Sequence, residues 1–173
     1  MTHTQQEMAR RQIEAARQYT LTLLDGLDDD DWFRQPVAVA SQLGVTHLAW
    51  QVAHLAMAEY GLTLFRQRGR QPEDGELMSS KFRKQFSKGS TPDPDPANNP
   101  PPAEIRAVFD RIHAQALREI ATYSDDELAA PVDAPYAAYG TRLGALLFCA
   151  HHEMLHAGQI GLIRRLLGKS PVR

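Results

Sequence analysis

The sequence predicts an all-α protein folded as an up-down four-helix bundle. Apolar residues recur at steps of three and four in four long stretches, which is the pattern of helices that bury one face. No stretch alternates apolar and polar residues as a half-buried strand does, and no Asn-Gly turn joins two candidate strands. The 173 residues suit a single domain, residues 1–173, with a core of ordinary size.

The first two helices are expected over residues 5–27 and 46–69. Four consecutive aspartates, residues 28–31, end the first helix, and we interpret this charge run as a solvated turn. Trp32 and Phe33 follow the aspartates, and we expect these two aromatic residues to fold back and cover one end of the bundle.

The last two helices are expected over residues 102–123 and 141–167. Before the third helix, residues 70–102 include the segment STPDPDPANNPPP, whose prolines remove backbone donors and restrict φ. We therefore expect a long Pro-rich loop between the second and third helices, either a lid or a surface segment. A second loop is expected over residues 129–140.

Composition excludes several functional classes. Lys and Arg total 19 and Asp and Glu total 21, so the formal charge is -2 and no basic excess is available for nucleic acid. No apolar run approaches the ~20 residues that span a bilayer, and the first residues lack an apolar signal core. The single cysteine cannot form an internal disulfide. We expect a soluble, cytoplasmic protein whose partner is a small molecule, not nucleic acid or membrane.

Three histidines are the candidate metal ligands. His152 and His156 lie one helical turn apart on the apolar stripe of the last helix, so both imidazoles can reach one point. Each would otherwise need its own hydrogen-bond partners inside a dry core, whereas one divalent ion satisfies both. His54, central in the apolar stripe of the second helix, is expected to supply the third ligand. Three ligands leave a position open for water or substrate, as catalytic sites do.

Other residues of the same types are weaker candidates. A single histidine on an apolar face is more often a core residue with a satisfied hydrogen bond. His47 lies too far along its helix to share the metal, His113 sits at a core edge, and His151 faces elsewhere. Cys149 is interpreted as a small buried thiol and not as a ligand.

The run from His152 to His156 also matches the zinc-protease motif His-Glu-x-x-His, in which Glu153 would be the general base. That motif expects a third ligand further along the chain. Residues 157–173 contain no His, Asp, Glu or Cys, so a zinc-dependent peptidase is the less favoured alternative.

Three segments together resemble the DinB/YfiT-like superfamily of metal-dependent enzymes. They are Trp50-Gln-Val-Ala-His54-Leu, His152-Glu-Met-Leu-His156-Ala-Gly-Gln-Ile160 followed by Leu166-Leu-Gly168, and Asp31-Trp-Phe33 with Pro36. The resemblance implies a four-helix bundle, often a homodimer, with His54, His152 and His156 as metal ligands. Members of the superfamily include hydrolase-like proteins, and transferases or isomerases that use low-molecular-weight thiols.

We therefore expect a metal-dependent enzyme with Zn²⁺ or Ni²⁺ at this site, forming a homodimer. The ion would lower the pKa of a water molecule or of a low-molecular-weight thiol, which suits a hydrolase or a thiol transferase. Glu153 and Gln159 are the expected catalytic residues. Glu153 would handle protons, and Gln159 would hydrogen-bond a ligand or the substrate. Glu59 is a further candidate for proton handling, although a solvated helix residue is the favoured interpretation of it. The alternative is a non-catalytic, metal-stabilised bundle that works by dimerisation.

Overall fold

The computed structural model describes residues 4–35, 46–132 and 137–172. These described residues form helices joined by turns, together with an isolated β-bridge between Pro131 and Thr141. The predicted all-α class is therefore confirmed.

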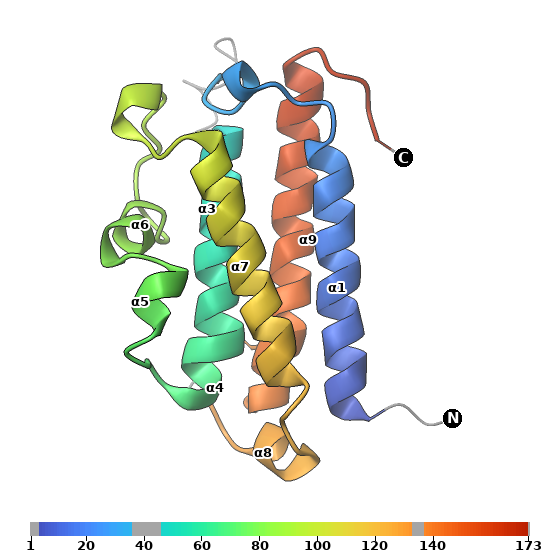
Figure 1. Cartoon of the computed structure of the whole chain (residues 1–173). Helices are drawn as coiled ribbons and strands as arrows, with labels where there is room; N and C mark the ends of the chain where they lie inside the picture. The colour runs from blue at the N-terminus through green and yellow to red at the C-terminus, as the bar shows by residue number, and fades with distance from the viewer. Residues whose placement is uncertain (1–3, 36–45, 133–136, 173) are drawn as a thin grey trace.

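Four long helices lie side by side along most of the length of the molecule (Figure 1). They are α1 (Gln5–Leu24), α3 (Leu48–Glu59), α7 (Pro102–Ile120) and α9 (Arg142–Leu166). Capping groups explain where two of them begin, because the hydroxyl of Thr4 accepts from the N–H of Glu7 and that of Thr141 from the N–H of Gly144. The ends agree with the expected stretches to within about one turn.

The chain continues past Glu59 in the same direction. A six-residue π-helical segment, η2 (Tyr60–Phe65), follows α3 and leads into the short α4 (Arg66–Arg68). Gly69, with a φ of 77°, ends this helix. The expected helix over residues 46–69 is thus one continuous helical stretch that contains a π-helical segment. Such segments are rare and are often found at functional sites.

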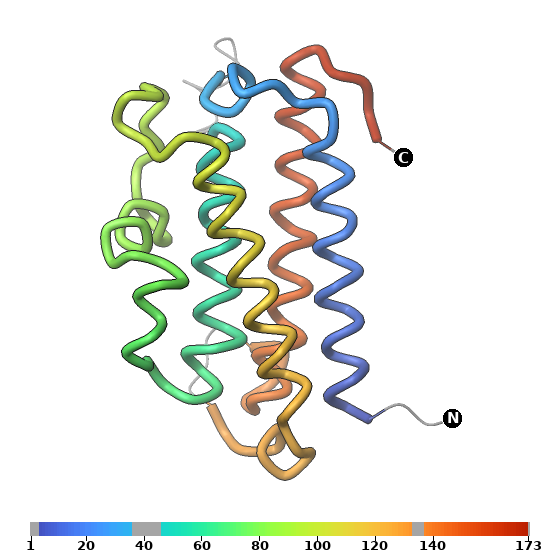
Figure 2. The backbone as a smooth tube through the Cα atoms, in the orientation of Figure 1, coloured from blue at the N-terminus to red at the C-terminus, as the bar shows by residue number. Residues whose placement is uncertain are grey.

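The order of helix directions differs from the predicted up-down alternation. α1 and α3 are antiparallel, but α7 runs parallel to α3, and α9 then returns in the opposite direction (Figure 2). An ion pair between Arg68, at the end of α4, and Glu119, near the end of α7, reflects this parallel pairing (Nε to Oε2, 2.7 Å). The predicted alternation is wrong because the segment between these helices is long enough to cross back along the bundle.

This crossover covers residues 69–101 and is more ordered than the expected Pro-rich loop. It contains α5 (Asp74–Leu77), α6 (Ser80–Gln85) and the 3₁₀ turn η3 (Pro96–Asn98). Met78, Phe82 and Phe86 from the crossover are buried in one core cluster with residues of α3 and α7. Apolar anchors therefore order its first half, whereas most of its prolines lie in the second half.

The aspartate run after α1 is only partly a solvated turn. Asp31 is buried, and its carboxylate accepts from the N–H of Asp28 and pairs with the ammonium of Lys169 at 2.7 Å. The pattern of charges around residues 28–31 cannot predict a contact with the C-terminal segment, and the prediction of a solvated turn is therefore wrong for Asp31. Trp32 and Phe33 are buried, as expected.

Two parts of the predicted pattern fall outside the described residues. They are Pro36, after the first helix, and residues 133–136, in the second expected loop. None of the described helices combines the length and the apolar character needed to cross a membrane.

Candidate metal centre

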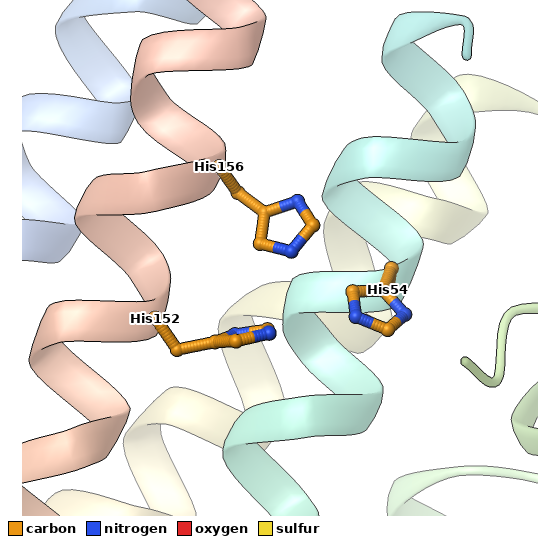
Figure 3. A group of neighbouring side chains, drawn as sticks. All are labelled: His54, His152 and His156. Carbon is orange, nitrogen blue, oxygen red and sulfur yellow. The ribbon is translucent and has the colours of Figure 1, made fainter. Parts of the chain in front are cut away.

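Three imidazole rings from two helices meet between α3 and α9. His54 comes from α3, His152 and His156 come from α9, and Figure 3 shows the rings directed toward the space between the helices. Ring centroids are 4.5 Å apart for His152 and His156, 4.9 Å for His54 and His156, and 5.4 Å for His54 and His152. One nitrogen from each ring lies within 4.8 Å of the other two. The structure thus brings together the three predicted ligands in a group that could hold a metal ion.

The orientation of His54 is set by the crossover and by a neighbouring indole. Its Nδ1 lies 2.8 Å from the carbonyl oxygen of Phe86, and because a carbonyl only accepts, Nδ1 carries the proton. The ring stacks on Trp50 with centroids 4.6 Å apart and planes 7° apart. Trp50 in turn donates from Nε1 to the hydroxyl of Ser90 at 3.0 Å. The lone pair of His54 is therefore on Nε2.

His156 is oriented by an amide in the same way. Its Nδ1 donates to Oε1 of Gln51. In this orientation of the Gln51 amide, its Nε2 donates to Oε1 of Gln159 at 2.7 Å and also to the hydroxyl of Thr46. With the amide in this orientation, Nδ1 of His156 carries the proton and Nε2 carries the lone pair that a metal ligand needs.

The three rings are neutral at physiological pH. Burial lowers the pKa of His54 and lowers that of His152 to about 4. Burial, with His152 and His54 as neighbours, lowers the pKa of His156 to about 3. Since imidazole binds metals only in its neutral form, the fold holds these side chains ready for a cation.

A pocket of about 420 Å³ opens beside His54 and His152. Its apolar lining comes from α3, η2 and α9 and consists of Met57, Ala58, Gly61, Leu62, Phe65 and Phe148. Arg66, Ser87 and Lys88 form the polar part of the described lining. A concave, mostly apolar site beside convergent polar groups is the usual form of a small-molecule site.

The sequence model of the DinB superfamily matches residues 12–160 of this chain. The chain belongs to the DinB superfamily. The matched range includes all three histidines of the cluster, and the predicted family is thereby confirmed. A search of curated proteins gave no match.

Two carboxylates of this DinB-superfamily chain, those of Glu59 and Glu153, lie in a second buried polar cluster that is separate from the histidines. Glu153 accepts from Nε of Arg17 at 2.9 Å, and Glu59 accepts from Nη2 of Arg17 at 2.6 Å. Glu59 also accepts from Nδ1 of His113 at 2.7 Å. Both carboxylates that the sequence suggested for proton handling are thus already paired. Burial would raise the pKa of Glu59, but Arg17 and His113 outweigh it and hold that pKa below its usual value.

The remaining sequence candidates lie elsewhere in the fold. His47 is buried at the start of α3, where its Nδ1 accepts from the N–H of Trp50 at 3.1 Å and its Nε2 donates to the carbonyl of Asp93 at 2.9 Å. His151 is exposed. Cys149 is buried outside the histidine group, and burial raises the pKa of its thiol well above the usual value.

Two groups that orient the histidines were missed from the sequence. Gln51 precedes His54 by three residues on the same helix, and this spacing could have identified it as a neighbour of the site. The carbonyl of Phe86 is a backbone group, which leaves no signal in residue identity. Gln159, which the sequence did single out, reaches His156 only through Gln51.

Proposed function

We propose that this DinB-superfamily chain is a metal-dependent enzyme acting on a small molecule. In this proposal Nε2 of His54, Nε2 of His156 and one ring nitrogen of His152 hold a divalent ion. The observation that carries the proposal is the group of three neutral imidazoles, gathered within 4.8 Å and opening onto a pocket. A site with three protein ligands and an accessible side is the usual form of a catalytic centre and not of a closed structural one.

The donor set fits a borderline cation. The three potential ligands are imidazole nitrogens, which suit Zn²⁺ and Ni²⁺, whereas Mg²⁺ and Ca²⁺ prefer oxygen. The outer Nδ1 atoms of His54 and His156 are each satisfied by a carbonyl oxygen, the arrangement that fixes and strengthens histidine ligands. Zn²⁺ and Ni²⁺ are therefore the proposed cofactors.

When bound, such an ion lowers the pKa of a water molecule or a thiol toward neutrality, which supplies a nucleophile for hydrolysis or for thiol transfer. The chain's own residues provide orientation. Phe86 and Gln51 keep the protons on Nδ1, and Gln159 holds the amide of Gln51 in place. Glu153 is not proposed for proton handling, because its carboxylate pairs with Arg17.

The geometry favours an enzyme over the two alternatives. A non-catalytic metal-stabilised bundle needs no pocket at the ion, yet one lies against His54 and His152. A zinc-dependent peptidase needs Glu153 beside the ion as general base, and its carboxylate is bound by Arg17.

We also propose that two copies of the chain pair through α9. Leu155, Leu162 and Leu166 leave 63%, 44% and 40% of their surfaces exposed and are spaced to form one stripe. The family resemblance supports a second copy as the occupant. Light scattering after size exclusion is expected to give twice the chain mass for the wild type and the single chain mass for Leu155→Glu/Leu162→Glu.

An activity panel tests the enzymatic proposal. Zinc-loaded, nickel-loaded and metal-free protein would be assayed on small esters, amides and acceptors for a low-molecular-weight thiol, beside His152→Ala. We expect one of these reactions with metal, and a fall of at least about a hundredfold without metal or in His152→Ala. His151→Ala, changed at the exposed neighbour, is expected to keep its activity. Turnover that survives metal removal would contradict the proposal.

A further inference from the structure

The pocket beside His54 and His152 has walls of a definite chemical character. Met57 and Leu62 contribute aliphatic surface, and Phe65 and Phe148 contribute aromatic surface. Phe65 lines the pocket although 50% of its own surface is exposed. A large aromatic side chain left open to water beside a concave site is surface available to a ligand. No carboxylate is among the described lining residues.

Gly61, in the wall of this pocket, has a backbone conformation that residues other than glycine can also adopt. Gly61 lies in the π-helical segment η2, where glycine weakens a helix relative to alanine. Its φ is not positive, so L-residues can adopt its conformation. A Cβ at this position would meet no other group within 4 Å. Since Gly61 lines the pocket, the missing side chain leaves open volume there.

We propose that this pocket binds a compact apolar body of the substrate, aliphatic or aromatic, and that Gly61 sets the size it admits. The proposal rests on the proposed function, because the reacting group of the substrate is taken to face His54 and His152. A volume of about 420 Å³ suits a small organic molecule. Burying an apolar body against the apolar walls is favourable, and a polar body could find hydrogen-bond partners only along the part of the lining that Arg66, Ser87 and Lys88 provide.

Gly61→Leu tests the assignment, because it fills the pocket from a position with room for a side chain. Gly75→Leu is the matched control: Gly75 is also helical, is exposed, has no group within 4 Å of a built Cβ, and lies outside the pocket. The first probe is indole, titrated calorimetrically into metal-free protein. We expect the wild type and Gly75→Leu to bind indole, and Gly61→Leu to bind it at least about tenfold more weakly.

The second set of probes consists of hydroxamic acids, which can bind the metal through the hydroxamate group and place an alkyl chain in the pocket. Acetohydroxamic, butyrohydroxamic and hexanohydroxamic acids would be titrated into zinc-loaded protein. Each methylene buried in the pocket is expected to tighten binding about fourfold in the wild type. Gly61→Leu is expected to lose this gain while its affinity for acetohydroxamic acid stays unchanged.

A further variant guards against a folding defect in Gly61→Leu. Phe65→Ala removes a half-exposed wall and should leave folding intact, and we expect it to weaken hexanohydroxamic acid several-fold more than acetohydroxamic acid. Absence of indole binding to the wild type, or equal indole binding by the wild type and Gly61→Leu, would overturn the assignment. If zinc fails to bind but indole binding depends on Gly61, the metal proposal fails and the apolar pocket stands.

Discussion

The molecule buries a charged cluster contributed by α1, α3, α7 and α9 and a histidine cluster contributed by α3 and α9, and the two differ in how their polar atoms are satisfied. In the charged cluster, Arg17 pairs with Glu59 and Glu153, and Glu59 also accepts from His113. In the histidine cluster, the outer nitrogens of two rings are satisfied by carbonyl oxygens, and one nitrogen of each ring lies within 4.8 Å of the other two. Polar groups that are buried with protein partners indicate a structural role, whereas three ring nitrogens that converge on one point fit a bound ligand such as a cation.

The boundary between the clusters runs between two adjacent residues. His152 belongs to the histidine cluster and Glu153 to the charged cluster, because successive positions on a helix point about 100° apart. The His-Glu-x-x-His motif therefore divides between two sites here, instead of forming one catalytic unit.

The largest effect is expected from breaking the charged cluster. Arg17→Met leaves the buried carboxylate of Glu153 without its counter-charge and Glu59 with His113 alone, which we expect to lower the free energy of unfolding by about 3–5 kcal/mol. The control is Arg10→Met, which removes the exposed pair with Glu14 and should cost about 0.5 kcal/mol or less. Urea denaturation measures both, and equal losses for the two variants would contradict a structural role for the cluster.

Metal binding at the histidine cluster is expected to raise the free energy of unfolding of the protein by almost as much as Arg17→Met lowers it. Zinc at a hundredfold excess over its Kd should raise the free energy of unfolding by about 2.7 kcal/mol, since it binds the folded chain alone. The His54→Ala/His152→Ala/His156→Ala variant should show no such gain. Urea denaturation with and without zinc makes the comparison. An equal response of both proteins would place the binding site elsewhere.

The two amide side chains behind His156, Gln51 and through it Gln159, should affect the affinity for the metal. Gln51→Leu removes the acceptor for Nδ1 and is expected to weaken zinc binding about ten- to a hundredfold. Gln159→Leu acts only through Gln51 and should have a smaller effect. Competition with a chromophoric chelator measures these affinities. If Gln159→Leu weakens binding more than Gln51→Leu does, the proposed order of the two amides is wrong.

The smallest effect concerns pH in the metal-free protein. Burial lowers the pKa of His152 to about 4 and of His156 to about 3, so the unfolded chain takes up protons at a higher pH than the folded one. The free energy of unfolding is therefore highest above the unfolded pKa of about 6.5 and falls as the pH drops toward 4. Between pH 8 and pH 6 we expect a loss on the order of 1 kcal/mol. His152→Ala/His156→Ala should show a smaller loss in urea denaturation, and an unchanged pH dependence would contradict this origin.

The sequence predicted what local geometry controls. Spacing on one helix placed His152 and His156 together, and the apolar stripe around His54 directed that ring inward. Pairings across long separations were not predictable: Arg17 and Glu153 lie 136 residues apart, and no local pattern couples them. The parallel course of α3 and α7 was missed for a related reason, since it depends on how the crossover packs.

The metal content of the purified protein tests the central claim most directly. Elemental analysis is expected to find about one zinc or nickel ion per chain in the wild type and in His151→Ala, whose changed side chain is exposed. His54→Ala and His156→Ala should each lose that ion. Metal retained in both variants, or none bound by the wild type after reconstitution, would contradict the assignment of the three imidazoles as a metal centre.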